Sequence, residues 1–309
     1  RLRKKLNAIP APEALSCACL KKGGEGVPTL YIVATPIGNL GDMTPRAIET
    51  LKQVSLIAAE DTRVTRKLLS AFDIHTPLTS CHEHNETEKA QAIIGRMLAE
   101  DIDVAVTTDA GTPCISDPGS ILADLAIQNQ ICVVAVPGAS AIIAALSISG
   151  FALEEFTFYG FLPRQKNALQ ARLTEIAAQS KIAVAYESPH RVIALLESVE
   201  AVLPDTQISI SCDLTKKFEL TLHGNVSDIL QNLRQNPKAN KGEYCIVFKW
   251  QAQPVQETEA ETTSLEAMLF DGVIKGLSLR ESMDKLIAQG QRKNAVYAAS
   301  LRVKDMLTL

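Results

Sequence analysis

Short apolar runs alternate with segments of helical periodicity from Thr29 onward, and this alternation restricts the chain to few folds. LYIVA at 30–34 and DVAV at 103–106 have the composition of buried strands. Each run is followed by a turn rich in glycine and proline and then by a helical pattern. Parallel sheets with helices on both faces are built in this way. The sequence therefore predicts an α/β fold.

The longest of these turns is TTDAGTPCISDPG, from Thr107 to Gly119. We expect Asp117 to cap the following helix and Pro118 to occupy its first turn. Residues 109–116 would then shape a pocket at the carboxyl end of a strand, where open α/β sheets bind ligands. The alternative is a tight turn that merely needs glycine.

Two further special turns, PIGN at 36–39 and VPGAS at 136–140, follow other strands. No GxxxxGK[ST] or GxGxxG motif is present, so the sequence does not support a P-loop hydrolase or a dinucleotide site. Backbone groups of such turns can hold a polar cofactor. The uncharged region 125–153 divides into a strand (132–136), a turn and a small-residue helix, so we expect no membrane span.

Three pairs of residues predict helix starts. Thr44 with Pro45 is one, and Ser188 as N-cap with Pro189 in the first turn is another. Asn85 with Glu88 resembles a capping box.

A chain of 309 residues is long enough for two or three domains. The predicted divisions are a disordered leader at 1–27, an N-terminal α/β domain at 28–150, a second α/β domain at 151–250, a linker at 251–263 and a helical, helix-turn-helix-like domain at 264–309. The leader lacks the apolar run of a signal peptide. The seven cysteines form no CxxC pair and are expected to be reduced thiols, so a cytoplasmic location is expected.

The charge distribution is uneven. A net charge of −4 argues against a uniformly basic nucleic-acid binder. Between Lys275 and Lys304, however, the sequence contains seven basic residues and only two acidic ones, Glu281 and Asp284. This excess of positive charge favours contact with a phosphate backbone. A solvated helical bundle is the alternative. The cysteines form no CxxC pair and the histidines no HExxH, so no metal site is expected.

The order of several long motifs resembles that of the ribosomal RNA small subunit methyltransferase I family, which has the tetrapyrrole-methylase fold. The resemblance covers roughly 29–249, and the C-terminal helices resemble the family's small tail. The motifs are LYIVATPIGNLGD (30–42), AAEDTR (58–63), HEHNE (82–86), DAGTPCISDPG (109–119), VPGAS (136–140), YESPHR (186–191) and LTKKFE (214–219).

The resemblance implies S-adenosylmethionine-dependent 2′-O-methylation of a cytidine ribose in the decoding region of 16S rRNA, within the small ribosomal subunit. It also implies two α/β domains with the cofactor in the cleft between them, and a homodimer. The cofactor-binding residues carried over by motif are Pro36, Gly38, Gly111, Thr112, Ile115, Ser140, Ala141, Tyr186 and Glu187, with Asp109 shaping the loop or the cleft.

A ribose hydroxyl must lose its proton during such a transfer, which calls for a base and a neighbouring cation. The candidates are Asp61 and Glu60 as base, Arg63 or Lys216 as positioning cation, and Asn85 as hydrogen-bonding orienter. Each could instead be a helix cap or part of a surface ion pair. The sequence does not identify which carboxylate is the base.

Two other functions are compatible with this fold. One is a small-molecule methyltransferase acting on a tetrapyrrole precursor, although the basic tail and the motifs at 58–63 and 82–86 disfavour it. The other is an rRNA-binding protein without catalytic activity.

Overall fold

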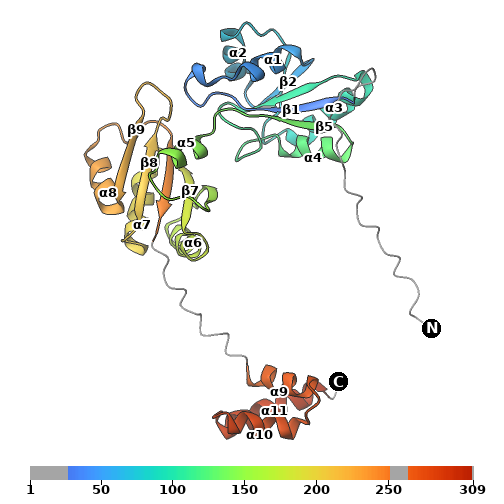
Figure 1. Cartoon of the computed structure of the whole chain (residues 1–309), viewed down its shortest axis with the longest axis vertical. Coiled ribbons are helices and arrows are strands. Elements are labelled where there is room, and N and C mark those ends of the chain that lie inside the picture. Colours follow the sequence, from blue (N-terminus) through green and yellow to red (C-terminus); the bar gives the residue numbers. More distant parts are fainter. Residues whose placement is uncertain (1–26, 251–263, 308–309) are drawn as a thin grey trace, which may run out of the picture. The chain divides into compact units, whose positions relative to one another are not determined.

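The computed structural model describes residues 27–250 and 264–307 (Figure 1). The chain divides into two compact units, residues 1–251 and 252–309. The predicted leader, apart from Val27, and the predicted linker lie outside the described residues. The first unit contains two five-stranded sheets.

The first sheet is parallel throughout and has the strand order β3-β2-β4-β1-β5. Its strands are β1 (Thr29–Val33), β2 (Leu56–Ala59), β3 (Leu78–Ser80), β4 (Val104–Thr107) and β5 (Cys132–Val136). The helices after them are η1 (Leu40–Asp42), α1 (Pro45–Gln53), α2 (Thr62–Ala71), α3 (Glu86–Glu100) and α4 (Ser120–Gln128).

Helices cover both faces of this sheet (Figure 1). On one face, Leu51 of α1 and Leu69 of α2 share a buried cluster with Ile57 of β2. On the other, Met97 of α3 and Leu122 of α4 pack in a cluster with β1, β2 and β4. The prediction of a parallel sheet covered on both faces is confirmed, because strands buried on both sides require continuous apolar runs.

The second sheet has the order β6-β7-β10-β8-β9, in which β6 and β7 are parallel and the other neighbours antiparallel. Its strands are β6 (Thr157–Phe161), β7 (Ile182–Glu187), β8 (Gln207–Cys212), β9 (Leu220–Asn225) and β10 (Tyr244–Lys249). The associated helices are α5 (Ala141–Ile148), α6 (Lys166–Gln179), α7 (Val192–Val202) and α8 (Val226–Gln235).

Helix α5 precedes the second sheet in the chain and nevertheless packs on it. Ile142 and Leu146 of α5 share a buried cluster with Val184 of β7 and Val247 of β10, while α6, α7 and α8 contribute to the cluster on the opposite face. The predicted boundary at residue 150 thus follows a helix that already contributes to the core of the second sheet.

Helix α4 begins at Ser120, so the prediction that Asp117 and Pro118 start it is wrong. The N-cap is Gly119, with φ of 119°, and no side chain of its own segment caps the helix. The buried Glu86 of α3 does so instead, because its Oε1 accepts hydrogen bonds from the backbone N–H groups of Gly119 (2.8 Å) and Ile121 (2.9 Å).

The other helix starts agree with expectation in part. Thr44 caps α1 by accepting a bond from Ala47 N, as predicted. Asn85 precedes α3 but forms no capping box, since its side chain accepts from His82 N. A turn begins at Ser188, and α7 itself starts only at Val192.

The second unit consists of α9 (Leu265–Ile274), α10 (Leu279–Ala288) and α11 (Lys293–Leu307). Leu269, Leu286 and Val303 are members of its own small core. Within the described ranges, 27–250 and 264–307, no helix has the length and apolar character needed to cross a bilayer.

Candidate active site

A cavity of about 800 Å³ in the first unit is lined by segments from both sheets. One wall follows β4 and the start of α5, and the other comes from β6, β7, β10 and the segment after β8. The lining residues central to its chemistry are Gly111, Thr112, Ile115, Asp117, Ser140, Ala141, Phe158, Phe161, Tyr186, Glu187, Leu214 and Tyr244. Its size is that of a site for a drug-sized or cofactor-sized ligand.

The special turns of the first sheet are bonded to one another on the cavity wall. Thr35, before the PIGN turn, exchanges two backbone hydrogen bonds with Gly111, at 2.8 and 3.0 Å. The hydroxyl of Thr112 donates to Ala139 O at 3.3 Å. Glycine is needed at 111 because φ there is 88°. The three turns therefore form one connected wall.

The PIGN turn also meets the segment after β8. A methyl group on Gly38 would collide with Lys216 Cγ and lie 3.1 Å from Leu214 O. Lys216 is held in place by ion pairs to Asp213 (2.7 Å) and Glu243 (2.9 Å). This close approach joins a turn of the first sheet to the rim of the second.

Aromatic side chains form the opposite wall. The Tyr186 ring lies 4.9 Å from that of Phe158 and 5.8 Å from that of Phe161, measured between ring centres. Burial raises the pKa of the Tyr186 hydroxyl, so it stays protonated at neutral pH. The ring surfaces of this wall are apolar, and the carboxylates beside them, Glu187 and Glu243, are paired with Arg191 and Lys216.

Asp117 supplies a carboxylate to the cavity. Burial, together with the nearby charge of Glu60, raises the pKa of Asp117 to about 6. Glu60 itself accepts a hydrogen bond from the Thr108 hydroxyl at 2.6 Å and a longer one from Asp109 N. A half-buried carboxyl group with a pKa near neutrality is suited to proton transfer.

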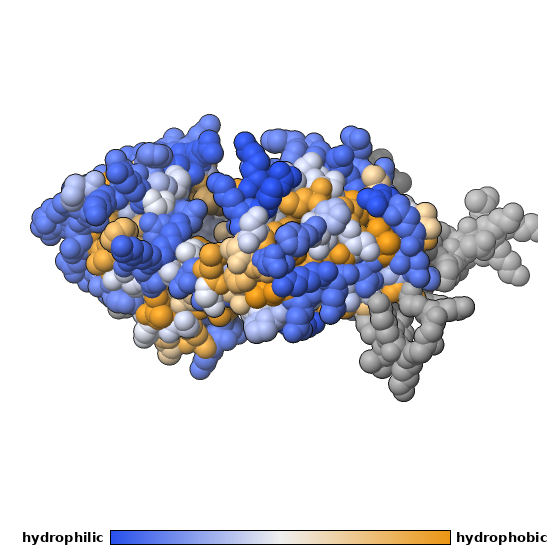
Figure 2. Space-filling view, turned by 90° about the horizontal axis from the view of Figure 1, so that it is seen from above, coloured by the Kyte–Doolittle hydropathy of each residue, from blue (hydrophilic) through white to orange (hydrophobic). Residues whose placement is uncertain are grey.

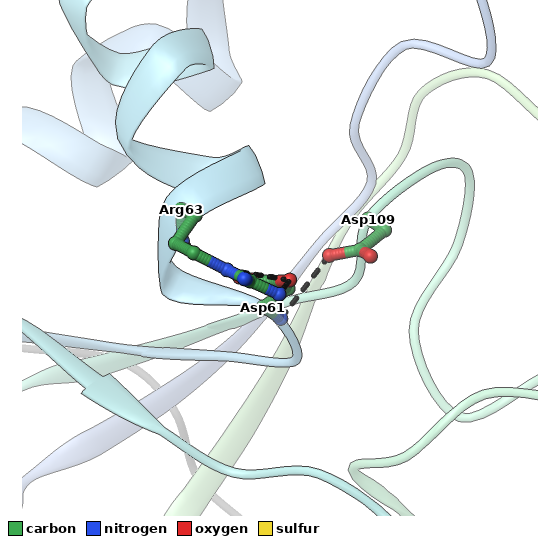
Figure 3. A network of polar contacts seen from close by, with 3 residues as sticks. All are labelled: Asp61, Arg63 and Asp109. Atoms are coloured by element: carbon green, nitrogen blue, oxygen red, sulfur yellow. Dashed lines mark hydrogen bonds and ion pairs between the residues drawn. The ribbon is translucent and has the colours of Figure 1, made fainter.

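Asp61 and Arg63 lie at the start of α2, beside Asp109 (Figure 3). Arg63 binds the Asp61 carboxylate through Nε and NH2, the latter at 2.6 Å, and Asp61 N donates to Asp109 Oδ1 at 3.1 Å. These bonds from Arg63 lower the pKa of Asp61 to about 2. Burial, with the charge of Glu60 next, raises the pKa of Asp109.

The residues predicted to bind cofactor divide into two groups. Those that line the cavity are Gly111, Thr112, Ile115, Ser140, Ala141, Tyr186 and Glu187. Those that lie outside its lining are Pro36, Gly38 and Asp109. Glu187 is buried and paired with Arg191 at 3.2 Å, so it shapes the wall. Their roles toward a cofactor stay predictions.

None of the predicted catalytic residues (Glu60, Asp61, Arg63, Asn85, Lys216) lines this cavity. The sequence predicts Asp117 only as a helix cap. Its raised pKa depends on burial and on Glu60, which is far away in the chain, so no local pattern indicates it. The sequence also does not indicate Phe158 and Phe161, because strict alternation would place them on opposite faces of the strand, and only the register shift between them lets both line the cavity. Among the described residues, no group of three or more His, Cys, Asp or Glu could hold a metal ion.

Comparison with known proteins defines the class of enzyme. The family model of the tetrapyrrole (corrin/porphyrin) methylases matches residues 29–230. The structure of a cobalt precorrin-4 methyltransferase superposes with a TM-score of 0.53 at 16% identity, covering 73% of this chain and 96% of that one. The methyltransferase CobJ gives 0.54 at 18% identity, with 73% and 95% covered. The fold is that of a tetrapyrrole methylase.

Relatives of higher sequence identity identify the family within this class of enzymes. Ribosomal RNA small subunit methyltransferase I of Halalkalibacterium halodurans is 43% identical, with 77% of this chain and 81% of that protein covered. The protein of the same name from Synechocystis sp. is 38% identical, with 89% and 98% covered. The chain belongs to the ribosomal RNA small subunit methyltransferase I family and is a methyltransferase. The methyl donor of this family is S-adenosylmethionine.

Proposed function

We propose that this protein transfers a methyl group from S-adenosylmethionine to the ribose 2′-hydroxyl of a cytidine in the decoding region of 16S rRNA. Relatives named for the small subunit rRNA support the substrate class. The observation that carries the proposal is the cavity itself, which combines backbone-rich turns, an aromatic wall and one carboxylate of near-neutral pKa.

The cavity suits the donor's chemistry. Backbone N–H and C=O groups around Gly111, Thr112 and Ala141 can bind its amino-acid and ribose portions, while Phe158 and Tyr186 offer an apolar surface for its adenine. S-adenosylmethionine supplies a methyl group already activated on a sulfonium. Fixed turns hold both reactants in alignment, which in well-oriented reactions lowers barriers by roughly 7–11 kcal/mol.

The chain must also accept the proton of a weakly acidic hydroxyl. Asp117 lines the cavity and is ionised above pH 6, so we assign it the role of proton acceptor. Asp61 is a weaker candidate because Arg63 occupies its carboxylate and holds its pKa near 2. Arg63, whose side chain is 87% exposed, and Lys216 remain candidates for contacts to RNA phosphate, and Asn85 for orientation.

The partner is the small ribosomal subunit, and α11 supports contact with RNA. Arg292 precedes this helix and Lys293 begins it, and both come shortly before the exposed Tyr297 and Leu301. Basic groups next to an exposed aromatic ring suit phosphate binding and base stacking. The second unit would thus capture rRNA while the first unit carries out the chemistry.

A homodimer in the cytoplasm completes the proposal. Ile148, Leu153, Phe156 and Phe161 expose apolar side chains around α5 and β6. On the face shown in Figure 2, apolar areas lie among hydrophilic ones. Exposed apolar groups of this kind are covered in oligomers. Light scattering coupled to gel filtration measures the mass directly.

The deciding experiment incubates the protein with labelled S-adenosylmethionine and unmodified small subunits, with free 16S rRNA in a parallel reaction, and then maps the label. We expect label on the ribose of one cytidine. Label on a base would refute the reaction type, and unlabelled rRNA in both reactions would refute the substrate. Incorporation into subunits alone would identify the assembled particle as the substrate.

A further inference from the structure

The loop after β8 presents an aromatic ring to solvent beside two cations. Phe218 is 75% exposed, the most exposed aromatic side chain of the described residues. The Nζ atom of Lys217 lies 5.6 Å from the centre of its ring, and that of Lys238, from the segment after α8, lies at 5.5 Å. We refer to Lys217, Phe218 and Lys238 as the Phe218 platform.

The backbone beneath this platform is fixed. Asp213 and Thr215 have positive φ, at 52° and 66°. Turn hydrogen bonds join Lys216 N to Asp213 O and Glu219 N to Lys216 O, and the Glu219 carboxylate accepts from Thr215 N at 2.7 Å. The ring is therefore held by a preorganised loop, which reduces the entropy lost on binding.

The same loop forms part of the cavity wall. Leu214, four residues before Phe218, lines the cavity, and so does Glu243, which binds Lys216. The platform is thus connected to the cavity wall through the three residues between Leu214 and Phe218.

The charges of the platform are available to a ligand. Neither Lys217 nor Lys238 forms an ion pair with a carboxylate in the described part of the chain, whereas Lys216 binds two. Both ammonium groups therefore lie beside the ring without a carboxylate partner among the described residues. An exposed ring beside two cations matches the chemistry of an unpaired nucleotide, whose base stacks and whose phosphates attract lysine.

We propose that the Phe218 platform binds an unpaired nucleotide of the rRNA strand that carries the target, the base stacking on Phe218 and the flanking phosphates lying near Lys217 and Lys238. This inference rests on the proposed function for the identity of the RNA. The platform would hold the strand single-stranded at the rim while the target nucleotide enters the cavity.

The test measures binding of the full chain to a short unstructured RNA of alternating cytidine and adenosine, with affinity for small subunits and for S-adenosylmethionine determined in parallel. Phe218→Ala should weaken RNA binding roughly tenfold to a hundredfold, the usual effect of losing one stacked base. Phe218→Trp should retain it. Cofactor affinity and thermal stability should not change, because the ring is exposed.

Removing the charges has a different signature. The double variant Lys217→Gln/Lys238→Gln should weaken binding and reduce the slope of log affinity against log salt by about 1.4, since each phosphate contact on a single strand contributes about 0.7. Phe218→Ala should leave that slope unchanged. The matched control, Lys52→Gln/Lys181→Gln, removes two exposed lysines from segments that precede β2 and β7, at the opposite strand ends, and should bind as wild type.

Unaltered RNA affinity in Phe218→Ala would overturn the inference. Loss of affinity for subunits alone, with binding to the oligonucleotide intact, would also overturn it and indicate a protein partner. The proposed function is judged separately by label transfer: wild-type protein that methylates no rRNA, while the platform variants still lose RNA affinity, would refute the function and leave the platform standing.

Discussion

Two aspartates in the segments after neighbouring strands have pKa values that are shifted in opposite directions. Asp61 follows β2 and forms an ion pair with Arg63. The hydrogen bonds from Arg63 lower the pKa of Asp61 to about 2. Asp117 lies in the loop after β4, where burial and Glu60 raise its pKa to about 6. The protonation of each carboxyl group is set by its neighbours in space.

Asp117→Asn is the first prediction at this scale. Loss of the proton acceptor should lower the rate of methyl transfer about 10²- to 10⁴-fold, with binding of S-adenosylmethionine retained. Single-turnover kinetics with small subunits and calorimetric titration of the cofactor measure both. Asp124→Asn, at an exposed position on α4, is the matched control. A normal rate in Asp117→Asn combined with a loss in Asp61→Asn would return the role to Asp61.

The pH dependence follows from the same group. Because the base must be ionised, kcat/KM in the wild type should fall as the pH drops through about 6. The folded-state pKa lies above the ordinary 3.8, so the ionised form is disfavoured in the folded state and stability is not lost as Asp117 is protonated. Asp117→Asn should accordingly be no less stable to urea than the wild type at neutral pH. A pH-independent kcat/KM between 5 and 7 would contradict the assignment.

At the scale of elements, α3 and α4 share a hydrophobic cluster and are also joined by one buried carboxylate. Glu86, at the first turn of α3, accepts two backbone hydrogen bonds from the start of α4. Those N–H groups have no partner within their own helix, because the first turn of any helix leaves its donors free. The loop that lines the cavity ends at Gly119, so Glu86 positions this loop by binding its last residue.

Glu86→Ala should therefore destabilise the first unit by about 2–3 kcal/mol, because it leaves buried donors unsatisfied. It should also weaken binding of S-adenosylmethionine, because residues 110–119 lose their anchor. Urea denaturation and calorimetric titration measure the two effects. The control is Glu88→Ala, an exposed residue on the same helical turn. Equal stability of the two variants would show that the cap contributes nothing.

The contact between the PIGN turn and the LTKKFE loop allows a rescue experiment. In Gly38→Ala the new methyl group collides with Lys216 Cγ, so the loop must shift and cofactor affinity should fall. Lys216→Ala removes that atom and breaks half-exposed ion pairs worth little in themselves. The double variant Gly38→Ala/Lys216→Ala should recover part of the affinity, giving a coupling of about 0.5–3 kcal/mol in a double-mutant cycle. Additive losses would exclude the contact.

At the scale of the whole molecule, the two units have separate cores. The helices α9, α10 and α11 bury Leu269, Leu286 and Val303 among themselves, whereas the cavity lies entirely in the first unit. Binding of RNA and binding of cofactor can therefore be separated by truncation. Domains of one chain commonly have their own hydrophobic cores in this way.

Deleting every residue after Gln251 should weaken capture of small subunits. Affinity for S-adenosylmethionine should stay within about twofold of wild type, because no cavity contact is removed and a tenfold change would need a loss of about 1.4 kcal/mol. Filter binding of subunits and calorimetric titration test this. Arg292→Ala/Lys293→Ala in the full chain should reproduce part of the loss. Subunit affinity equal to wild type in both variants would remove the second unit from recognition.

Local periodicity was enough to predict a parallel sheet, its strands β1, β2, β4 and β5 and the special turns at strand ends, because each depends on residues close together in the chain, whereas the short β3 and the strand order were not predicted. The same holds for the Thr44 cap. The motifs for the two lining turns, DAGTP and VPGAS, likewise pointed to Gly111 and Ser140. Only tertiary structure decided that Asp117 lines the cavity with a raised pKa, that Glu86 rather than Asp117 caps α4, and that α5 packs on the second sheet. Burial, charge and hydrogen-bond partners depend on residues brought together from distant parts of the chain, and no local pattern encodes them.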